Sequence, residues 1–215
     1  MTSVNFCKIA HLFNFLEMFA FGLSMTKSRS FIFCSKGKFR NVLMIGEGTG
    51  RFAKDFQHYY PHSKIVILEP SEKMRLEISK SLETDSENVK VLETRLENFK
   101  PSMQFDLICT CFFWDCFNTK QIDEFEVNFK HLCNSTRLWY NVDFYEPRIV
   151  GNLRSLSNIT IIRFLYGFFQ KFAHLDTCKL NSITHLFCQN GFSLVKQRVL
   201  LFPSIKSQLF KRTSS

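Results

Sequence analysis

The eight cysteines of this sequence include no Cys-x-x-Cys pair, so the usual spacing of a zinc site or a redox disulfide is missing. The chain also lacks any run of more than two Lys or Arg residues, although its formal net charge is +9. Scattered positive charge gives weak evidence for a nucleic-acid or membrane partner. We therefore expect reduced, buried thiols in a cytoplasmic protein, with no metal and with nucleic acid disfavoured as a partner.

Long apolar segments are missing as well. Residues 9–24 are mostly apolar, but His11, Asn14 and Glu17 interrupt them and no small-residue cleavage site follows. The stretch is shorter than the roughly 20 apolar residues that a membrane span needs. No repeat or low-complexity linker divides the 215 residues, of which 45% are hydrophobic. This length and composition predict one well-buried domain without a membrane span.

The most informative stretch is residues 42–50, Val-Leu-Met-Ile-Gly-Glu-Gly-Thr-Gly. Four apolar residues lead into three glycines, and residues 51–56 continue with helical spacing, which predicts a buried strand, a turn and a helix. Glycine can adopt positive φ and lets a ligand lie against the backbone. Free N–H groups at the start of the helix would face the ligand's acidic end. The pattern indicates a site for a nucleotide-type cofactor.

The glycine spacing alone leaves two cofactors open. The NAD fingerprint needs a third glycine at position 51 or 53, where the chain has Arg51 and Ala53, and the fingerprint tolerates alanine. A second signal follows in the apolar residues 65–68, which end in Glu69, 19 residues after Gly50. Nucleotide-binding folds place a carboxylate there against ribose hydroxyls. The glycine turn and Glu69 lie at the separation expected for a nucleotide site. The alternative, a strand and turn with an incidental surface Glu, is therefore the weaker interpretation.

From residue 41 onward, strands and helices alternate. Strands are expected at 41–45, 64–69, 89–93, 105–111 and 136–143, and helices at 50–59, 71–83 and 119–132. Apolar strands separated by helices require a mostly parallel sheet covered on both faces. Two late strands, from Gly191 to about 201 and from about 204 to 211, suggest an antiparallel hairpin at the sheet edge.

We divide the expected domain, residues 1–215, into four segments. Residues 1–40 form a helical preface, with an amphipathic helix at 5–23 and a short helix at 24–34. This preface is either a lid over the cofactor or a cover for the sheet edge. Residues 41–146 form the cofactor-binding core, residues 147–190 are mainly helical and cover the substrate, and residues 191–215 form the hairpin.

These features together resemble the class I S-adenosylmethionine-dependent methyltransferases with a Rossmann-like fold, in particular small bacterial enzymes related to the ubiquinone/menaquinone methyltransferases. The resemblance implies a seven-stranded sheet whose last strand is antiparallel. It is carried by residues 43–52, by Glu69-Pro70-Ser71 with Met74, and by residues 105–108 and 112–117, with further matches at 9–10, 16–17 and 21–22.

The resemblance implies roles for individual residues. Glu69 would hold both ribose hydroxyls of S-adenosylmethionine. Where the family has an Asp that accepts from the adenine amino group, this chain has Arg95, and Glu97 or a backbone carbonyl could substitute. The methionine part of the cofactor would be surrounded by Gly46, Glu47, Gly48 and Gly50, and its adenosine bordered by Pro70, Ser71 and Met74.

Methyl transfer requires an acceptor aligned with the S–CH₃ bond and, for a phenol, enol or amine, a base. Candidate bases are Asp115 and Asp143, since ligands bind at the carboxyl ends of the strands. A helix cap or a purely structural acid is the competing interpretation for each. Trp114, Tyr166 and Phe169 are candidates for lining an apolar acceptor pocket, although residues 159–172 could also be an ordinary amphipathic helix.

The sequence thus predicts an S-adenosylmethionine-dependent methyltransferase that acts on a small hydrophobic or aromatic acceptor. Three alternatives stay open: methylation of RNA or protein, a non-catalytic binding protein that retains the fold, and an NAD-dependent oxidoreductase. Residues 112–117 do not resemble the Asn-Pro-Pro-Tyr motif that presents a planar amino group, which disfavours the first. Arg95 is the feature that favours the second, and Glu47 disfavours the third.

Overall fold

The structure is a computed structural model, and it describes residues 22–35, 37–82, 87–145, 183–201 and 204–213. The predicted helix over residues 5–23 lies almost entirely outside this part of the chain. So does most of the predicted helical segment 147–190, including Tyr166 and Phe169. None of the described helices is long and apolar enough to cross a membrane.

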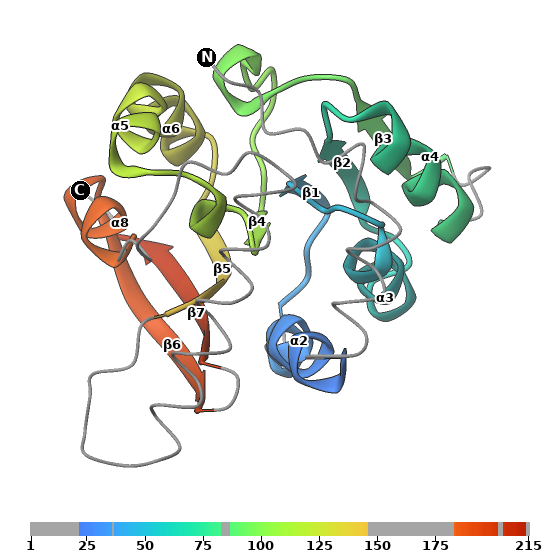
Figure 1. Ribbon diagram of the computed structural model, residues 1–215, viewed down its shortest axis with the longest axis horizontal. Helices are drawn as coiled ribbons and strands as arrows, with labels where there is room; N and C mark the ends of the chain where they lie inside the picture. Colours follow the sequence, from blue (N-terminus) through green and yellow to red (C-terminus); the bar gives the residue numbers. More distant parts are fainter. Residues whose placement is uncertain (1–21, 36, 83–86, 146–182, 202–203, 214–215) are drawn as a thin grey trace.

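The core of the molecule is one seven-stranded sheet with the order β3-β2-β1-β4-β5-β7-β6 (Figure 1). Strands β1 to β5 pair in parallel, whereas β7 is antiparallel to both of its neighbours. The predicted Rossmann-like sheet with an antiparallel hairpin is confirmed. The strands are β1 (Asn41–Ile45), β2 (Lys64–Leu68), β3 (Val89–Leu92), β4 (Leu107–Cys111), β5 (Leu138–Phe144), β6 (Phe192–Leu200) and β7 (Ile205–Arg212).

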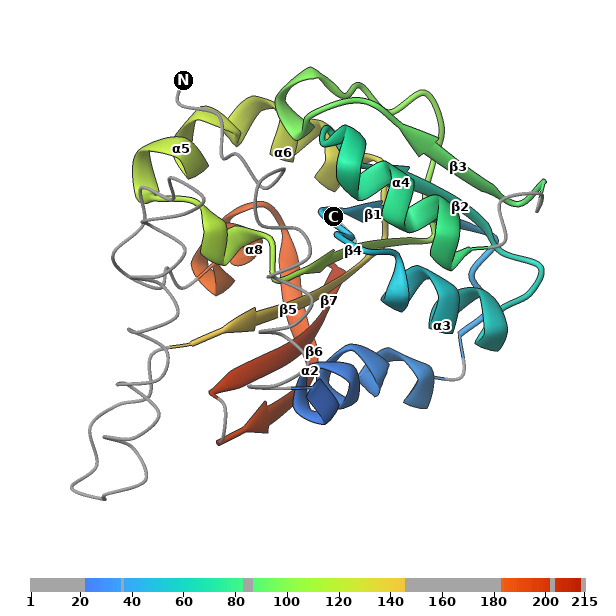
Figure 2. The ribbon, with the colours of Figure 1, turned by 45° about the vertical axis from the view of Figure 1, so that its right-hand side comes forward.

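Helices cover both faces of the sheet, as Figures 1 and 2 show. One face carries α2 (Gly22–Arg29), the 3₁₀ helix η3 (Ser30–Cys34), α3 (Arg51–Tyr59) and α4 (Glu72–Ser81). The other face carries η4 (Leu96–Asn98), η5 (Trp114–Cys116), α5 (Thr119–Glu124), α6 (Glu126–Asn134) and α8 (Thr184–Gln189). Two hydrophobic clusters result, one on each side of the sheet; aliphatic side chains dominate the first, and aromatic side chains make up half of the second. Most of the described phenylalanines are thus explained by core packing.

Helix α2 is attached to the sheet by hydroxyl groups that are distant in sequence. Tyr140 on β5 donates to the carbonyl oxygens of Ser28 and Arg29 at 2.5 and 3.1 Å. Ser207 on β7 donates to the Ser28 carbonyl at 2.9 Å. The unpaired carbonyls at the end of the helix therefore find partners in the sheet, which places α2 over the antiparallel half of the sheet (Figure 2).

The predicted helix over residues 119–132 is two helices, α5 and α6. Asn118 starts α5 with a capping box, in which its side chain accepts from Gln121 N and Gln121 Oε1 accepts from Asn118 N. A turn at Phe125 then separates α5 from α6. Phe125 is 4% exposed and packs edge-on against Phe117. Burial of this ring accounts for a break that the helical spacing of residues 119–132 did not show.

Candidate functional site

The glycine turn after β1 has the conformation that its sequence predicts. Gly46, Gly48 and Gly50 have φ values of +70°, +68° and +81°, which only glycine adopts without strain. The side chain of Glu47, 7% exposed, turns back so that Oε1 accepts from Ala53 N at 3.0 Å. Glu47 thereby caps α3, whose preceding residue Gly50 has no side chain that could do so.

An open space adjoins the turn at Gly48. A Cβ added to this residue would meet no described atom within 4 Å. The Gly48 N–H also favours the charged form of the Glu69 carboxyl, which places the end of β2 next to the turn. A backbone without side chains beside a carboxylate is what a nucleoside ligand requires.

Glu69 is buried at the carboxyl end of β2, with 6% of its surface exposed. Its Oε1 accepts from Ser71 N at 2.9 Å, which leaves further lone pairs of the carboxylate for a ligand's hydroxyl groups. Burial raises the pKa of Glu69 to about 7, while the N–H of Ser71, the charge of Arg75 and the N–H of Gly48 act in the opposite direction. Burial of the Glu69 carboxylate is unfavourable, and the group faces the glycine turn. Glu69 is therefore a candidate binding group.

The other predicted cofactor residues follow Glu69 directly. Ser71 is the N-cap of α4 and accepts from Met74 N at 3.4 Å, while Met74 is 4% exposed. Pro70 is exposed, and its carbonyl accepts from Arg75 Nη1 at 2.9 Å. The other end of α4 lies against the glycine turn, because Ser81, the last residue of the helix, donates to the Thr49 carbonyl at 2.7 Å.

Arg95 and Glu97 lie after β3, at the position where the resemblance implies an acidic residue. The Arg95 side chain is 43% exposed, and its Nη1 is 3.7 Å from Glu97 Oε1. Glu97, which could substitute for the missing acid, is therefore engaged in an ion pair with Arg95.

Asp115 and Asp143, the two predicted catalytic acids, meet at the carboxyl ends of β4 and β5. They are 7% and 8% exposed, and the charge of Asp115 contributes to a rise in the pKa of Asp143. Burial is the larger cause of that rise. Asp143 Oδ1 accepts from Phe113 N at 3.2 Å. The fold thus brings two carboxyl groups together from positions 28 residues apart in the sequence.

Cys116 is the third titratable group at this end of the sheet. Its thiol donates to Asp115 Oδ1 at 3.5 Å and to the Phe112 carbonyl at 3.6 Å. Burial and the nearby charge of Asp115 raise the pKa of the Cys116 thiol, so it stays protonated. The described cysteines are free thiols, and no described cluster of three His, Cys, Asp or Glu side chains could hold a metal.

Trp114, a predicted contact of the acceptor, lies in the core. It is 1% exposed, and its indole N–H donates to Thr110 Oγ1 at 3.2 Å. The ring packs against Phe129 and Trp139 in the core. Trp114 therefore supports the site from beneath, and the partly exposed aromatic rings at this position are those of Phe112, Phe113 and Phe117.

Phe112 has an unusual backbone conformation, with φ of +55° directly after β4. It is the one non-glycine residue with positive φ among the described ranges. The guanidinium of Arg29 lies 5.1 Å from the centroid of its ring. Phe112 belongs to residues 112–117, which carry the resemblance, but its positive φ has no signal in the sequence, because this conformation arises from how the chain turns between β4 and η5.

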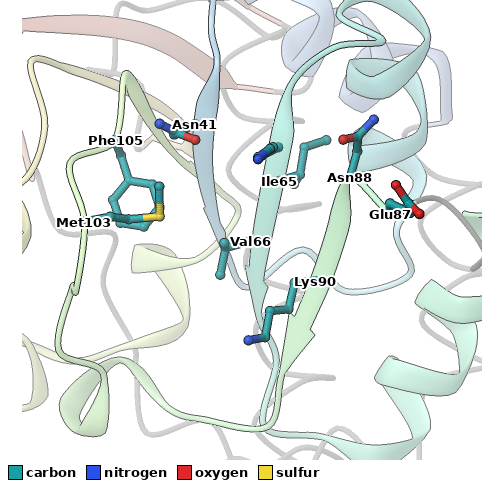
Figure 3. A pocket seen from close by; sticks show the side chains of 9 residues that line it. Asn41, Ile65, Val66, Glu87, Asn88, Lys90, Met103 and Phe105 are labelled. Carbon is teal, nitrogen blue, oxygen red and sulfur yellow. The ribbon is translucent and has the colours of Figure 1, made fainter.

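A hollow of about 220 Å³ lies elsewhere, at the amino ends of β1, β2 and β3 (Figure 3). Asn41, Asn88 and Lys90 are among the residues that line it. Ligands of open α/β sheets bind at the carboxyl ends of the strands, where Gly48, Glu69 and Asp143 lie. The hollow is therefore at the wrong end of the sheet to belong to the candidate site.

Comparisons with known proteins agree with this fold. A family model described as a methyltransferase domain matches residues 42–135. Malonyl-[acyl-carrier protein] O-methyltransferase 1 of Ilyobacter polytropus is 35% identical over 82 residues, which are 38% of this chain and 30% of that protein. The matched part thus spans less than a third of that relative.

Solved structures share the fold at low identity. N-methyltransferase NodS of Bradyrhizobium japonicum WM9, in complex with S-adenosyl-L-homocysteine, is 12% identical with a TM-score of 0.63, covering 90% of this chain and 88% of NodS. An O-methyltransferase family protein of Burkholderia thailandensis is 12% identical with a TM-score of 0.69, covering 95% of this chain and 60% of that protein. Residues 42–135 therefore match a methyltransferase domain, and the chain shares the Rossmann-like fold of these methyltransferase structures.

Proposed function

We propose that this protein binds S-adenosylmethionine at the carboxyl ends of β1 and β2 and transfers its methyl group to a small hydrophobic or aromatic acceptor. The observation that carries the proposal is the buried Glu69 carboxylate, which faces a glycine turn with open space at Gly48. This pair of features occurs within the segment that the methyltransferase family model matches.

The residues at the site fit the proposed cofactor. Glu69 has lone pairs available for two ribose hydroxyls, and Gly48 allows the backbone to approach the ligand closely. The start of α4 at Ser71 and Met74 lies where the adenosine would end. Similarity to NodS with bound S-adenosyl-L-homocysteine and to magnesium protoporphyrin IX methyltransferase of Synechocystis PCC 6803 with bound SAM supports this assignment. The latter is 12% identical, with a TM-score of 0.60, over 89% of this chain and 79% of that one.

When bound, this cofactor supplies an electrophilic methyl group, so the protein must hold the acceptor, exclude water and accept a proton. Asp115 and Asp143 lie on the side of β4 and β5 where an acceptor would approach. We assign them to proton transfer and to orienting the acceptor. Tyr166 and Phe169 remain proposed acceptor contacts outside the described residues. Both O- and N-methyltransferases are among the similar structures, which supports methyl transfer and leaves the acceptor atom open.

Calorimetric titration tests the cofactor. We expect micromolar binding of S-adenosylmethionine and S-adenosylhomocysteine, no binding of NAD, and at least tenfold weaker binding in Glu69→Ala. Binding of NAD alone would instead indicate an oxidoreductase. Binding of none of the three would contradict the proposal and favour an interaction protein that retains the fold, for which Arg95 is the supporting feature.

Transfer of a labelled methyl group to candidate acceptors tests the reaction. Quinone-like, phenolic and amine compounds form one panel, and RNA and protein extracts form the other. Labelling confined to the small molecules supports the proposal. Labelling of RNA that falls steeply with added salt would support the alternative suggested by the net charge.

A further inference from the structure

The hydroxyl of Thr110 is the centre of a buried hydrogen-bond network beneath the two catalytic candidates. It accepts from Trp114 Nε1 at 3.2 Å and from Trp139 Nε1 at 3.0 Å. It lies 2.9 Å from Asn141 Oδ1. All four side chains are at most 1% exposed, so water does not compete for these bonds.

The donor inventory fixes the direction of every bond in this network. Each indole N–H can only donate, so Thr110 Oγ1 must accept both, and its single proton goes to Asn141 Oδ1. The carboxamide of Asn141 is thereby oriented, with its NH₂ group available to a different neighbour. Asp143 is the next residue on the same face of β5, and the Asn141 amide interacts with its carboxyl group.

Asp143 combines deep burial with an unequal use of its two oxygens. Oδ1 accepts from Phe113 N at 3.2 Å, whereas Oδ2 is buried with no hydrogen-bond partner in the described part of the chain. A charged carboxylate in such a place would cost several kcal/mol without a paired cation. A neutral acid with its hydroxyl at Oδ2 avoids this cost and turns Oδ2 into a donor.

The groups around Asp143 also disfavour a negative charge there. The charge of Asp115, which approaches from η5, raises the pKa of Asp143, and the neutral thiols of Cys111 and Cys116 nearby bring no positive charge to offset it. Lys206 stands opposite Asp143 on β7, but its Nζ lies 4.5 Å from the centroid of the Tyr145 ring. Within the described ranges, no Lys or Arg forms an ion pair with Asp143. The amide of Asn141 and the N–H groups of Phe113 and Asp115 oppose the effect of burial without cancelling it.

We propose that Asp143 is a neutral carboxylic acid in the folded protein and presents an Oδ2–H donor to the methyl acceptor, with Asn141 as its positioning residue. This inference rests on the proposed methyltransferase function. It names the acceptor class: a compound with a carbonyl or carboxylate oxygen next to the atom that is methylated. That oxygen accepts from Asp143, while the ionised Asp115 accepts the acceptor's proton where there is one.

Bonds and protons balance in the proposed methyl transfer. The bond between the acceptor atom and the methyl carbon forms as the carbon–sulfur bond breaks, and the electron pair of that bond stays with sulfur. The proton of the acceptor goes to Asp115, and Asp143 keeps its own proton throughout. When two neighbouring carboxyl groups differ in pKa because of their environments, one can act as a proton donor and the other as a base.

Infrared spectroscopy of the protein without ligands tests the protonation state. At about pH 9, Glu69 is ionised, since its pKa is about 7, so the carbonyl stretch of a protonated carboxyl group reports on Asp143. We expect one such band in the wild type, in Asp115→Asn and in Glu69→Gln, and its loss in Asp143→Asn. In Asn141→Leu, which frees the carboxyl group from its amide neighbour, the band should shift in frequency.

Absence of the band in the folded wild type, or its persistence in Asp143→Asn, would overturn the proposal. Should Asp143→Asn fail to fold, ¹³C titration of the wild type decides instead, because one Asp side chain must keep its neutral-acid shift from about pH 5 to pH 9. Calorimetry with S-adenosylmethionine on the same samples distinguishes a failure of the proposed function from a failure of the role of Asp143. Lost cofactor binding in the wild type refutes the proposed function, whereas a missing band with intact binding refutes only the role of Asp143.

The acceptor class has its own test. Among labelled products, compounds with a free carboxylate or carbonyl beside the methylated atom should outperform the matched compounds that lack this oxygen by at least tenfold in kcat/KM. Asp143→Leu, which has no donor, should abolish this preference, while Asp143→Asn, whose Nδ2 can donate, should retain part of it. An equal preference in wild type and Asp143→Leu would exclude the contact.

Discussion

The ring of Phe113 lies against the backbone of Gly46: a Cβ at position 46 would be 2.6 Å from Phe113 Cδ2. Phe113 follows β4, so the absence of a side chain at Gly46 lets the turn after β1 pack against the segment that carries Asp115. Gly46→Ala should therefore destabilise the protein through both the positive φ and this collision, by about 2 to 4 kcal/mol in urea unfolding. An unchanged unfolding midpoint would mean that Phe113 moves away without cost.

Gly48 offers a sharper test of the cofactor site, because its missing side chain faces open space. Gly48→Ala should cost only the strain of φ +68°, about 1 to 2 kcal/mol, and yet abolish S-adenosylmethionine binding in calorimetry. Gly191→Ala is the matched control, since Gly191 has φ +78° and an added Cβ would lie 3.9 Å from Thr213 Oγ1. This control should lose similar stability and keep full binding. Equal binding by both variants would place the cofactor elsewhere.

The pKa of Glu69 should make the affinity for the proposed cofactor depend on pH. An ionised carboxylate is the stronger acceptor for ribose hydroxyls, and Glu69 is half ionised at about pH 7. The dissociation constant of S-adenosylhomocysteine should therefore rise by about tenfold per pH unit below about pH 6 and level off above pH 8. In Glu69→Gln, binding should be weak and independent of pH. A flat profile in the wild type would show that Glu69 does not contact the ligand as an anion.

The same carboxyl group should reduce stability at neutral pH. Since burial raises the pKa of Glu69 from 4.5 to about 7, the folded protein binds this proton more tightly than the unfolded chain does. The stabilisation that comes from the protonated Glu69 is fully present below about pH 4.5 and is lost as the pH rises through 7. Glu69→Gln should thus be more stable than the wild type at pH 8, by up to about 3 kcal/mol, and similar at pH 4. Denaturant unfolding at both values measures the difference, and a less stable variant at pH 8 would contradict this account.

Thr110→Val removes the shared acceptor of two buried indoles while conserving the side-chain shape. Leaving both N–H groups without a partner should cost about 2 to 5 kcal/mol in unfolding free energy and shift the tryptophan fluorescence spectrum. Thr110→Ser keeps the hydroxyl and is the control, with a loss below about 2 kcal/mol. Comparable losses in the two variants would indicate that packing of the methyl group, and not the network, stabilises this region.

Local patterns in the sequence determined the elements that form the proposed cofactor site. Apolar residues before Gly46 and before Glu69 are buried on β1 and β2, since a strand covered on both faces must be apolar at every position. The spacing of these two signals specified adjacent parallel strands, because a helix of ordinary length fits between them. The late hairpin followed from Gly191 and the two apolar runs after it. Residues 51–56 likewise predicted α3 from their helical spacing.

Contacts across the sheet were decided only by the tertiary structure. The residues around Asp115 in the sequence do not indicate that it lies close to Asp143. Their proximity depends on the pairing of β4 with β5, which the order of strands sets. The direction of the Thr110 network depends on donors from η5 and β5 that meet only when the sheet is formed. Trp114 looks like a pocket residue in the sequence and is a core residue in the fold. Burial and neighbouring charge, which set the protonation of Asp143 and Glu69, are properties of packing, and packing exists only in the folded chain.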